Sequence, residues 1–193
     1  MDDAGAELSK RGAGDGPLQR ARDLSLGGLM GALGVLLPVA FHAVGGGSAG
    51  KLFLPMHIPV LMAGLLCSPS VAASVGLLVP LVSWALTQMP PMVPPMAILM
   101  SAELATLGLA ASLIYRRGRT NLVLAVIGAM VAARIVYGAG LWITFPLFVP
   151  ATKAIPFWAY FGGGLVSSIP GVAIQLVAVP LAIRGIERIR LVR

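Results

Sequence analysis

Apolar runs separated by short polar or proline-rich stretches make up most of the sequence. Each run is about 16 to 25 residues long, which suits a helix that crosses a hydrocarbon core about 30 Å thick. The sequence lacks the alternating segments of about 10 residues that mark membrane barrels. The pattern predicts an all-α integral membrane protein with six transmembrane helices in one bundle. The expected spans are about residues 24–44, 53–68, a third span from a tight turn at 68–70 to 87, then 96–115, 121–145 and 158–183.

The segments outside these runs differ in character. Residues 1–23 are polar, glycine-rich and mixed in charge, and we expect a mobile cytoplasmic leader ahead of a transmembrane domain at 24–185. Residues 186–193 form a basic cytoplasmic tail. Between spans, the glycines of residues 45–52 predict a flexible loop, whereas the prolines of residues 88–95 predict a stiff one.

Composition and charge support the same class of protein. Hydrophobic residues make up 58% of the chain and charged residues 11%, and the mean hydropathy is +0.91. A soluble domain of this size could not bury so much apolar surface. Most basic residues flank the predicted spans on one side, which predicts that both termini are cytoplasmic. Anionic lipid headgroups then explain the net charge of +7 without nucleic acid. The basic residues on the predicted cytoplasmic side are Lys10, Arg11, Arg20, Arg22, Arg116, Arg117, Arg119, Arg184, Arg188, Arg190 and Arg193.

Two ionisable residues, Glu103 and Arg134, fall inside predicted spans. An unpaired charge at that depth is costly, so each is expected to find a partner or to face water. Counting inward at about 1.5 Å per residue gives depths of about 12 and about 16 Å, so we expect the two side chains to be within reach in the outer half of the bundle. They either form an ion pair that only holds helices together or contact a polar solute, and the sequence leaves both open.

Other polar residues of the apolar spans are candidates for the same solute site. His57 lies between Pro55 and Pro59, which remove backbone donors and leave nearby carbonyls free. A histidine bonded to such a carbonyl is the alternative interpretation. Two histidines without a carboxylate or cysteine at ligand spacing predict no metal site. The expected substrate-binding residues are His57, Trp84, Gln88, Glu103, Arg134 and Gln175.

Aromatic residues are expected mainly at the membrane interface or in the core. One or two of them are able to stack on a planar ligand. The residues concerned are Trp84, Trp142, Trp158, Tyr137 and Tyr160.

Small residues recur on one face of the first predicted span. Gly27 and Gly31 stand four positions apart, as do Gly28 and Ala32. This spacing places them on neighbouring strips of one helical face and lets another helix approach closely. The face either docks a partner or makes a tight contact inside the bundle.

Residues 45–52 also resemble a phosphate-binding loop. Gly45, Gly50 and Lys51 match its spacing. Leu52, however, replaces the hydroxyl residue that would hold magnesium, and a membrane helix precedes the segment where a strand is required. We therefore expect this chain neither to bind a nucleotide nor to hydrolyse ATP.

The order of several motifs resembles that of the substrate-binding S components of energy-coupling factor (ECF) vitamin transporters. The similarity covers residues 24–185, and its motifs are FLPMHIPVLMAGLL, a Ser-Pro turn, GLLVPLVSWALTQMPP and ELATLGLAASLIYRR. The resemblance implies a six-helix protein of the bacterial cytoplasmic membrane that captures a vitamin from outside the cell. It also implies association with a transmembrane coupling protein and two cytoplasmic ATPases.

The resemblance assigns roles to two further sets of residues. The motif that docks the coupling protein matches, with glycine where alanine is more usual, Gly27, Gly28, Gly31 and Ala32. The gating loops fall on residues 45–52 and 88–95, which include Gly46, Gly47, Pro90 and Pro91.

The substrate stays open, because members of this family share a scaffold and differ in the pocket. An Arg134 free of Glu103 would favour a carboxylate such as pantothenate. An Arg134 paired with Glu103 would leave a more neutral pocket.

Two other classes of function remain as alternatives. A self-sufficient secondary transporter or channel should have an inverted repeat or a continuous polar path, and neither is clear in the sequence. An intramembrane enzyme would have only His57 and Glu103 as a catalytic pair. We expect no enzymatic activity, no cofactor and no metal.

Overall fold

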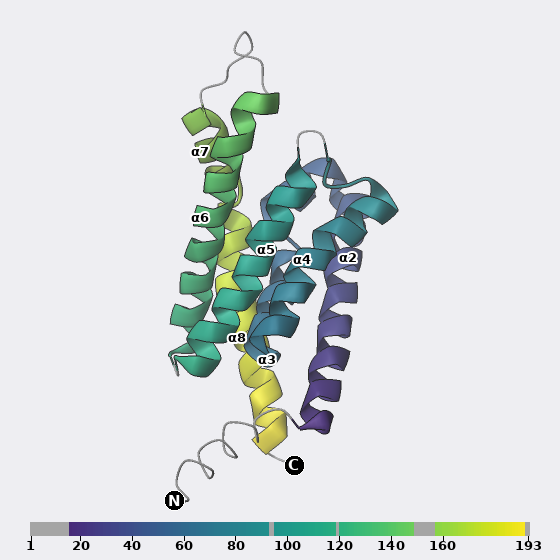
Figure 1. The fold of residues 1–193 in the computed structure, drawn as a ribbon, viewed down its shortest axis with the longest axis vertical. Coiled ribbons are helices and arrows are strands. Elements are labelled where there is room, and N and C mark those ends of the chain that lie inside the picture. Colours follow the sequence, from purple (N-terminus) through teal and green to yellow (C-terminus); the bar gives the residue numbers. More distant parts are fainter. Residues whose placement is uncertain (1–15, 93–94, 119, 149–156, 192–193) are drawn as a thin grey trace, which may run out of the picture.

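The computed structural model describes residues 16–92, 95–118, 120–148 and 157–191, and every regular element in these ranges is a helix (Figure 1). The helices pack lengthwise into one bundle, which agrees with the predicted all-α class. The elements are α2 (Pro17–Phe53), α3 (His57–Leu66), α4 (Pro69–Thr87), α5 (Met96–Ser112), the π-helix η1 (Leu113–Arg117), α6 (Leu122–Phe148), α7 (Phe157–Ser167) and α8 (Ile169–Leu191).

Five helical segments in the described part of the chain are long and apolar enough to cross a membrane. The third predicted span is α4, which ends at Thr87 as predicted but begins at Pro69, inside the turn expected at residues 68–70. The fourth corresponds to α5 with η1, and the fifth to α6, which continues through Pro146 to Phe148. The first predicted span corresponds to α2, which is longer at both ends. The sixth corresponds to α7 and α8, which together extend beyond the predicted limits.

The second predicted span, 53–68, is shorter than expected. Its helix α3 has 10 residues and begins only at His57. Leu54 has a positive φ of 48°, and Pro55 follows it. A residue before proline is disfavoured in the α region, so the chain leaves α2 and turns here. Alone, α3 is too short to cross a hydrocarbon core.

The predicted loop at 45–52 is wrong, because α2 continues as one helix to Phe53. Gly46 and Gly47 therefore belong to a helix in this structure. Glycine weakens a helix by about 1 kcal/mol but keeps its N–H donor, so the backbone hydrogen bonds of α2 continue through the segment. The helix also begins before the predicted span, at Pro17, because proline suits the first helical position.

The sixth predicted span is divided into α7 and α8, which meet at Ser168. The Ser168 N–H donates to the Leu165 carbonyl at 3.2 Å, and the Ser168 carbonyl accepts from the Val172 N–H at 3.0 Å. Pro170 stands in the first turn of α8, where its missing donor is tolerated. Ser168 therefore belongs to neither helix, and it is 3% exposed.

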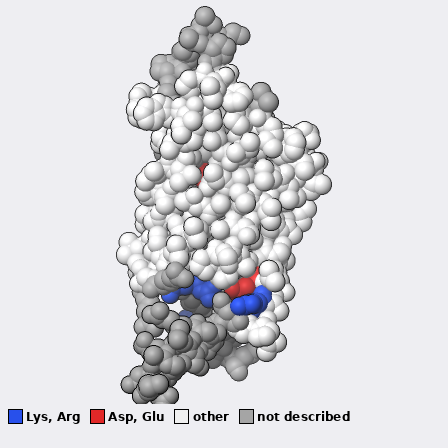
Figure 2. Space-filling view, viewed as in Figure 1, with Lys and Arg blue, Asp and Glu red and all other residues white. Residues whose placement is uncertain are grey.

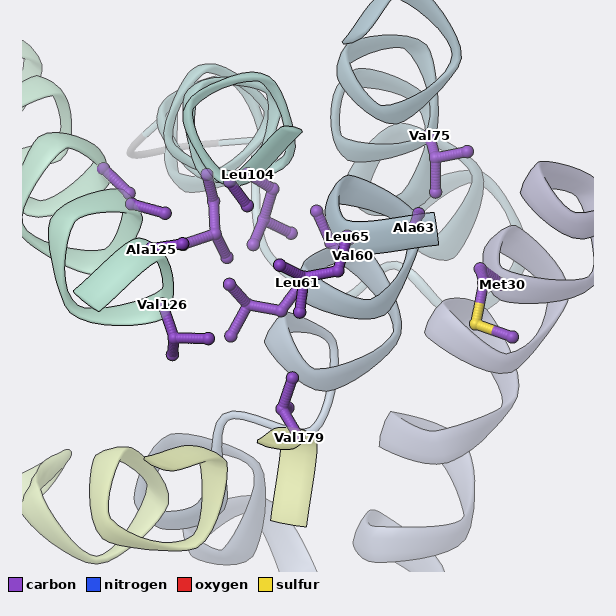
Figure 3. Close-up of a cluster of buried hydrophobic side chains, with 14 of the residues drawn as sticks. Met30, Val60, Leu61, Ala63, Leu65, Val75, Leu104, Ala125, Val126 and Val179 are labelled. Carbon is purple, nitrogen blue, oxygen red and sulfur yellow. The ribbon is translucent and has the colours of Figure 1, made fainter. Parts of the chain in front are cut away.

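The short helix α3 lies at the centre of the bundle. Figure 3 shows Leu61 of α3 among Leu104 of α5, Val126 of α6 and Val179 of α8. All four side chains are completely buried. Seven of the ten residues of α3 are buried, so the longer helices cover most of its surface.

Glycines allow α3, α4 and α5 to approach at backbone contact. A Cβ atom added at Gly64 would lie 2.7 Å from the Gly108 carbonyl oxygen, and one added at Gly108 would lie 2.6 Å from the Ala72 carbonyl oxygen. At Gly76 an added Cβ would overlap the Leu104 carbonyl of α5. Small residues at such crossings are typical of membrane helices, which associate by close packing.

A buried carboxylate joins the start of α2 to the turn between α3 and α4. Asp23 is 5% exposed and accepts a hydrogen bond of 2.8 Å from the backbone N–H of Ser68, the residue that precedes α4. A negative charge at a helix N-terminus is favourable because the first N–H groups carry partial positive charge. Asp23 thus stabilises the start of α4 and holds α2 beside it.

Charged side chains gather at one end of the bundle. The start of α2 and the end of α8 lie at this end (Figure 1). Figure 2 shows charged residues there, whereas the visible face along the length of the bundle is almost entirely uncharged. Basic residues near the described helix ends at this side include Arg20, Arg22, Arg116, Arg184 and Arg188.

Replacing Gly76 by alanine should destabilise the bundle, because the new methyl group meets backbone that cannot move aside. Overpacking of this kind costs about 1–3 kcal/mol. The measurement is the thermal unfolding midpoint of the purified protein in detergent. Gly185→Ala is the control, since nothing lies within 4 Å of a Cβ at that position of α8. Equal midpoints for the two variants would contradict the contact between α4 and α5.

Candidate functional site

Glu103 of α5 is a buried carboxylate at the junction of three helices. Its side chain is 3% exposed, and its Oε1 lies 3.0 Å from NH1 of Arg134 on α6 and 3.5 Å from Nε2 of His57 on α3. A carboxylate in an apolar bundle requires a compensating charge, and Arg134 supplies it. The sequence placed Glu103 and Arg134 within reach of each other, and the structure brings them together.

His57 lies behind this ion pair, away from the surface. It is 3% exposed, and its Nδ1 has no hydrogen-bond partner among the residues that the structure describes. The predicted alternative, a bond to a free carbonyl, is therefore not made by Nδ1. His57 contributes Nε2 toward Glu103, at a distance near the upper limit for a hydrogen bond.

Arg134 extends from the buried pair toward α8. Its NH2 lies 3.4 Å from the Oγ of Ser168, and that hydroxyl donates to the Leu165 carbonyl at 2.9 Å. The Arg134 side chain is 23% exposed. One edge of the guanidinium therefore holds Glu103, and another part is accessible between α6 and α8.

This accessible part of Arg134 lies in a groove formed by α6, α7 and α8. The groove has a volume of about 620 Å³, within the usual range of small-molecule sites. Among the described residues that line it, the polar side-chain groups are those of Arg134 and Ser168, apart from the indole nitrogens. The remaining walls are aliphatic side chains, glycine and the aromatic rings of Trp142, Trp158 and Phe161.

Gly138 brings the aromatic end of the groove close to α6. A Cβ added there would lie 3.0 Å from the ring of Phe161 on α7. Gly138 stands one helical turn from Arg134, and Trp142 one turn further along α6. The groove thus has aromatic walls at one end and a charge-assisted hydrogen-bond donor near its middle.

Other predicted substrate-binding residues lie elsewhere. Gln175 of α8 is fully buried, and both its Nε2 and its Oε1 have no hydrogen-bond partner among the described residues. Two nearby residues of α8, Val172 and Leu176, line the groove, but Gln175 does not. The burial of two unpaired polar atoms is costly, and the structure offers no physical account of it.

Trp84 and Gln88 stand at the end of α4, outside the groove. Gln88 adopts a left-handed conformation with φ 58°, and its N–H donates to the Trp84 carbonyl at 2.7 Å. It closes α4 as a C-cap. The loop that follows contains Pro90 and Pro91, and the Ser83 hydroxyl donates to the Met89 carbonyl at 2.9 Å to hold its start.

Ser168, Trp142, Trp158 and Phe161 line the groove but are absent from the predicted binding residues. Pro170 could have indicated a helix break at Ser168. A proline, however, fits the first turn of a new helix as well as a kink inside a continuous span. For the tryptophans, stacking on a ligand was one of the expected roles. A lipid-facing aromatic side chain and a ligand-facing one have the same sequence pattern, so the pattern could not select these two.

The small residues of α2 divide into two groups. Gly27 faces the bundle, because a Cβ added there would lie 2.5 Å from Val71 of α4. Nothing lies within 4 Å of a Cβ at Gly28 or Gly31, and Gly28 and Ala32 are exposed. The two interpretations of this motif therefore apply to different residues: Gly27 makes an internal contact, and the others leave a shallow outer surface.

The described residues contain no group of three or more His, Cys, Asp or Glu side chains arranged to hold a metal ion. The described residues that line the groove offer hydrogen bonding from Arg134 and Ser168 together with apolar and aromatic contact. This arrangement suits reversible binding of a small molecule.

Comparison with known proteins identifies the family. Residues 22–183 match the profile of the ECF transporter, substrate-specific component. No curated protein and no solved structure matches the chain. The match covers most of the chain, including all residues of the ion pair and the groove, so the protein belongs to the family of substrate-specific components of ECF transporters.

Proposed function

We propose that this chain captures a vitamin or vitamin-like molecule from outside the cell and delivers it across the bacterial cytoplasmic membrane. It does so as the substrate-specific subunit of an ATP-driven ECF transporter. The observation that carries the proposal is the groove of about 620 Å³ between α6, α7 and α8, into which a neutralised Arg134 projects. Family membership and several helices long enough to span a membrane support a transport role.

The distribution of charge supports an orientation with both termini in the cytoplasm. Basic residues at the start of α2, in η1 and at the end of α8 favour the cytoplasmic side. In this orientation the aromatic end of the groove, at Trp142 and Trp158, lies toward the outside. A solute then enters at the aromatic end and meets Arg134 deeper in the bundle.

The exposed part of the α2 motif supports a docking role. Gly28 and Ala32 present a shallow strip on which a partner helix can lie closely. We assign this strip to the transmembrane coupling protein, and ATP hydrolysis to the two cytoplasmic ATPases. Membership of a family of transporter subunits supports a role in transport over one in catalysis.

A bulky side chain in the groove should displace the captured molecule. Val131→Trp places an indole on a wall of the groove, and we expect the ligand affinity to fall at least about tenfold, or about 1.4 kcal/mol. The measurement is mass spectrometry of small molecules released when the purified protein is denatured. Leu124→Trp is the control, since its side chain is similarly exposed on α6 (57% against 54%) but lies outside the groove.

Wild-type protein that releases no small molecule, from cells grown with all vitamins, would contradict the capture function. Equal release by the Val131→Trp and Leu124→Trp variants would contradict the groove as its site.

Transport should depend on the coupling module. Cells that express this chain with the coupling protein and ATPases should concentrate the labelled molecule identified by mass spectrometry, and cells with the chain alone should only bind it. Ala32→Leu should keep binding and lower uptake at least about tenfold, because a larger side chain separates the docked helices. Ala85→Leu is the matched control at an exposed position of α4.

Concentrative uptake by the chain alone would overturn the partner-driven mechanism and favour a secondary transporter. Full uptake by the Ala32→Leu variant would overturn the docking role of the α2 strip.

A further inference from the structure

The net charge of the groove follows from the position of Glu103. Of the described residues that line the groove, Arg134 alone carries a charge. That charge is compensated from behind, because the Glu103 carboxylate lies 3.0 Å from NH1 and is almost completely buried. A ligand in the groove therefore meets a cation whose counter-ion is already in place.

An anionic ligand would be unfavourable beside this pair. Its carboxylate would share Arg134 with Glu103, and together with an uncharged His57 these groups would carry one uncompensated negative charge. The apolar surroundings do not screen that charge as water does. Displacing Glu103 from Arg134 offers no alternative, since the carboxylate would then stay buried with only the 3.5 Å contact to His57.

A neutral acceptor, by contrast, finds donors that the ion pair leaves available. Guanidinium carries five N–H groups in a fixed plane. One contact of Arg134 goes to Glu103 and one, at 3.4 Å, to Ser168. The exposed edge can donate to a carbonyl or hydroxyl oxygen without any change in the net charge of the site.

The walls add a shape requirement. Trp142 and Trp158 flank the outer end of the groove, and Phe161 is held close to α6 at Gly138. Flat rings stack favourably on such side chains. From Arg134 to Trp142 the helix rises about 12 Å, at about 1.5 Å per residue. A ligand that uses both ends therefore has a ring at one end and an acceptor within that distance.

We propose that the groove selects an uncharged ligand with a planar ring and a carbonyl or hydroxyl acceptor. Arg134 and Ser168 bind the acceptor, and Glu103 determines the preference by neutralising Arg134. This inference rests on the capture function proposed above and specifies the class of its substrate. It excludes free carboxylates as preferred ligands, although a lone arginine in an apolar groove would favour them.

The test compares two probes of nearly the same shape, the neutral naphthalene-2-carboxamide and the anionic 2-naphthoate, which differ in charge and in one group, NH2 against O⁻. Binding to the purified full chain is measured by quenching of tryptophan fluorescence. We expect the wild type to bind the amide at least about tenfold more tightly than the carboxylate. Glu103→Gln removes the counter-ion, and the preference should shift by at least about tenfold toward the carboxylate.

A double variant, Glu103→Gln with Arg134→Gln, controls for the loss of the buried charge. It has no unpaired ion at the site, so it tests the charge argument even where the single variant fails to fold. It should return to the amide preference and bind both probes more weakly than the wild type. Tighter binding of the carboxylate by the wild type, or a double variant that prefers the carboxylate, would overturn the proposal.

The molecule released from the native protein separates this inference from the capture function. An uncharged compound with a planar ring supports both. A carboxylic acid overturns the neutral preference but leaves capture intact. Phospholipid as the sole released compound overturns both, because the groove would then be a site for an acyl chain. Failure of both probes to bind would also contradict the proposed ligand class.

Discussion

The ion pair between Glu103 and Arg134 is the constraint on which the centre of this bundle depends. A carboxylate that is 3% exposed inside an apolar protein is tolerated only with a cation at contact distance. This requirement fixes α6 against α5, and His57 and Ser168 bring α3 and α8 to the same pair. The groove beside α6 lies next to this pair, because Arg134 extends from the buried carboxylate to Ser168, which also lines the groove.

The sequence predicted these features where the local signal was strong. Ser68 and Pro69 mark the start of α4, and the Gln88–Pro95 prolines mark its end, so that span was predicted closely, with an error of about one turn at its start. The meeting of Glu103 and Arg134 followed from simple depth counting, because a charge in an apolar span has few alternatives to pairing. The family was likewise accessible from motif order alone, and the profile match over residues 22–183 agrees.

Tertiary packing decided what the sequence could not. Gly46 and Gly47 favour a loop by local preference, yet α2 continues through them because each keeps its backbone donor. The break at Ser168 was missed because Pro170 has the same pattern at a kink and at a helix start. Lining residues such as Trp142 were not selected, because an apolar side chain that faces a groove and one that faces lipid are equivalent in sequence. Glu103, predicted to bind substrate, lies instead behind the residue that lines the groove.

The hydrogen bond between Asp23 and the Ser68 amide has a mechanical meaning for this bundle. It joins α2, whose outer strip is free, to the turn from which α3 rises through the core toward His57. If α2 tilts at this end, it must either carry the turn along or break a charge-assisted bond in a buried position. The bond therefore couples movement of α2 to α3, and a displacement of the outer surface of α2 is passed through Ser68 and α3 to His57, which contacts Glu103.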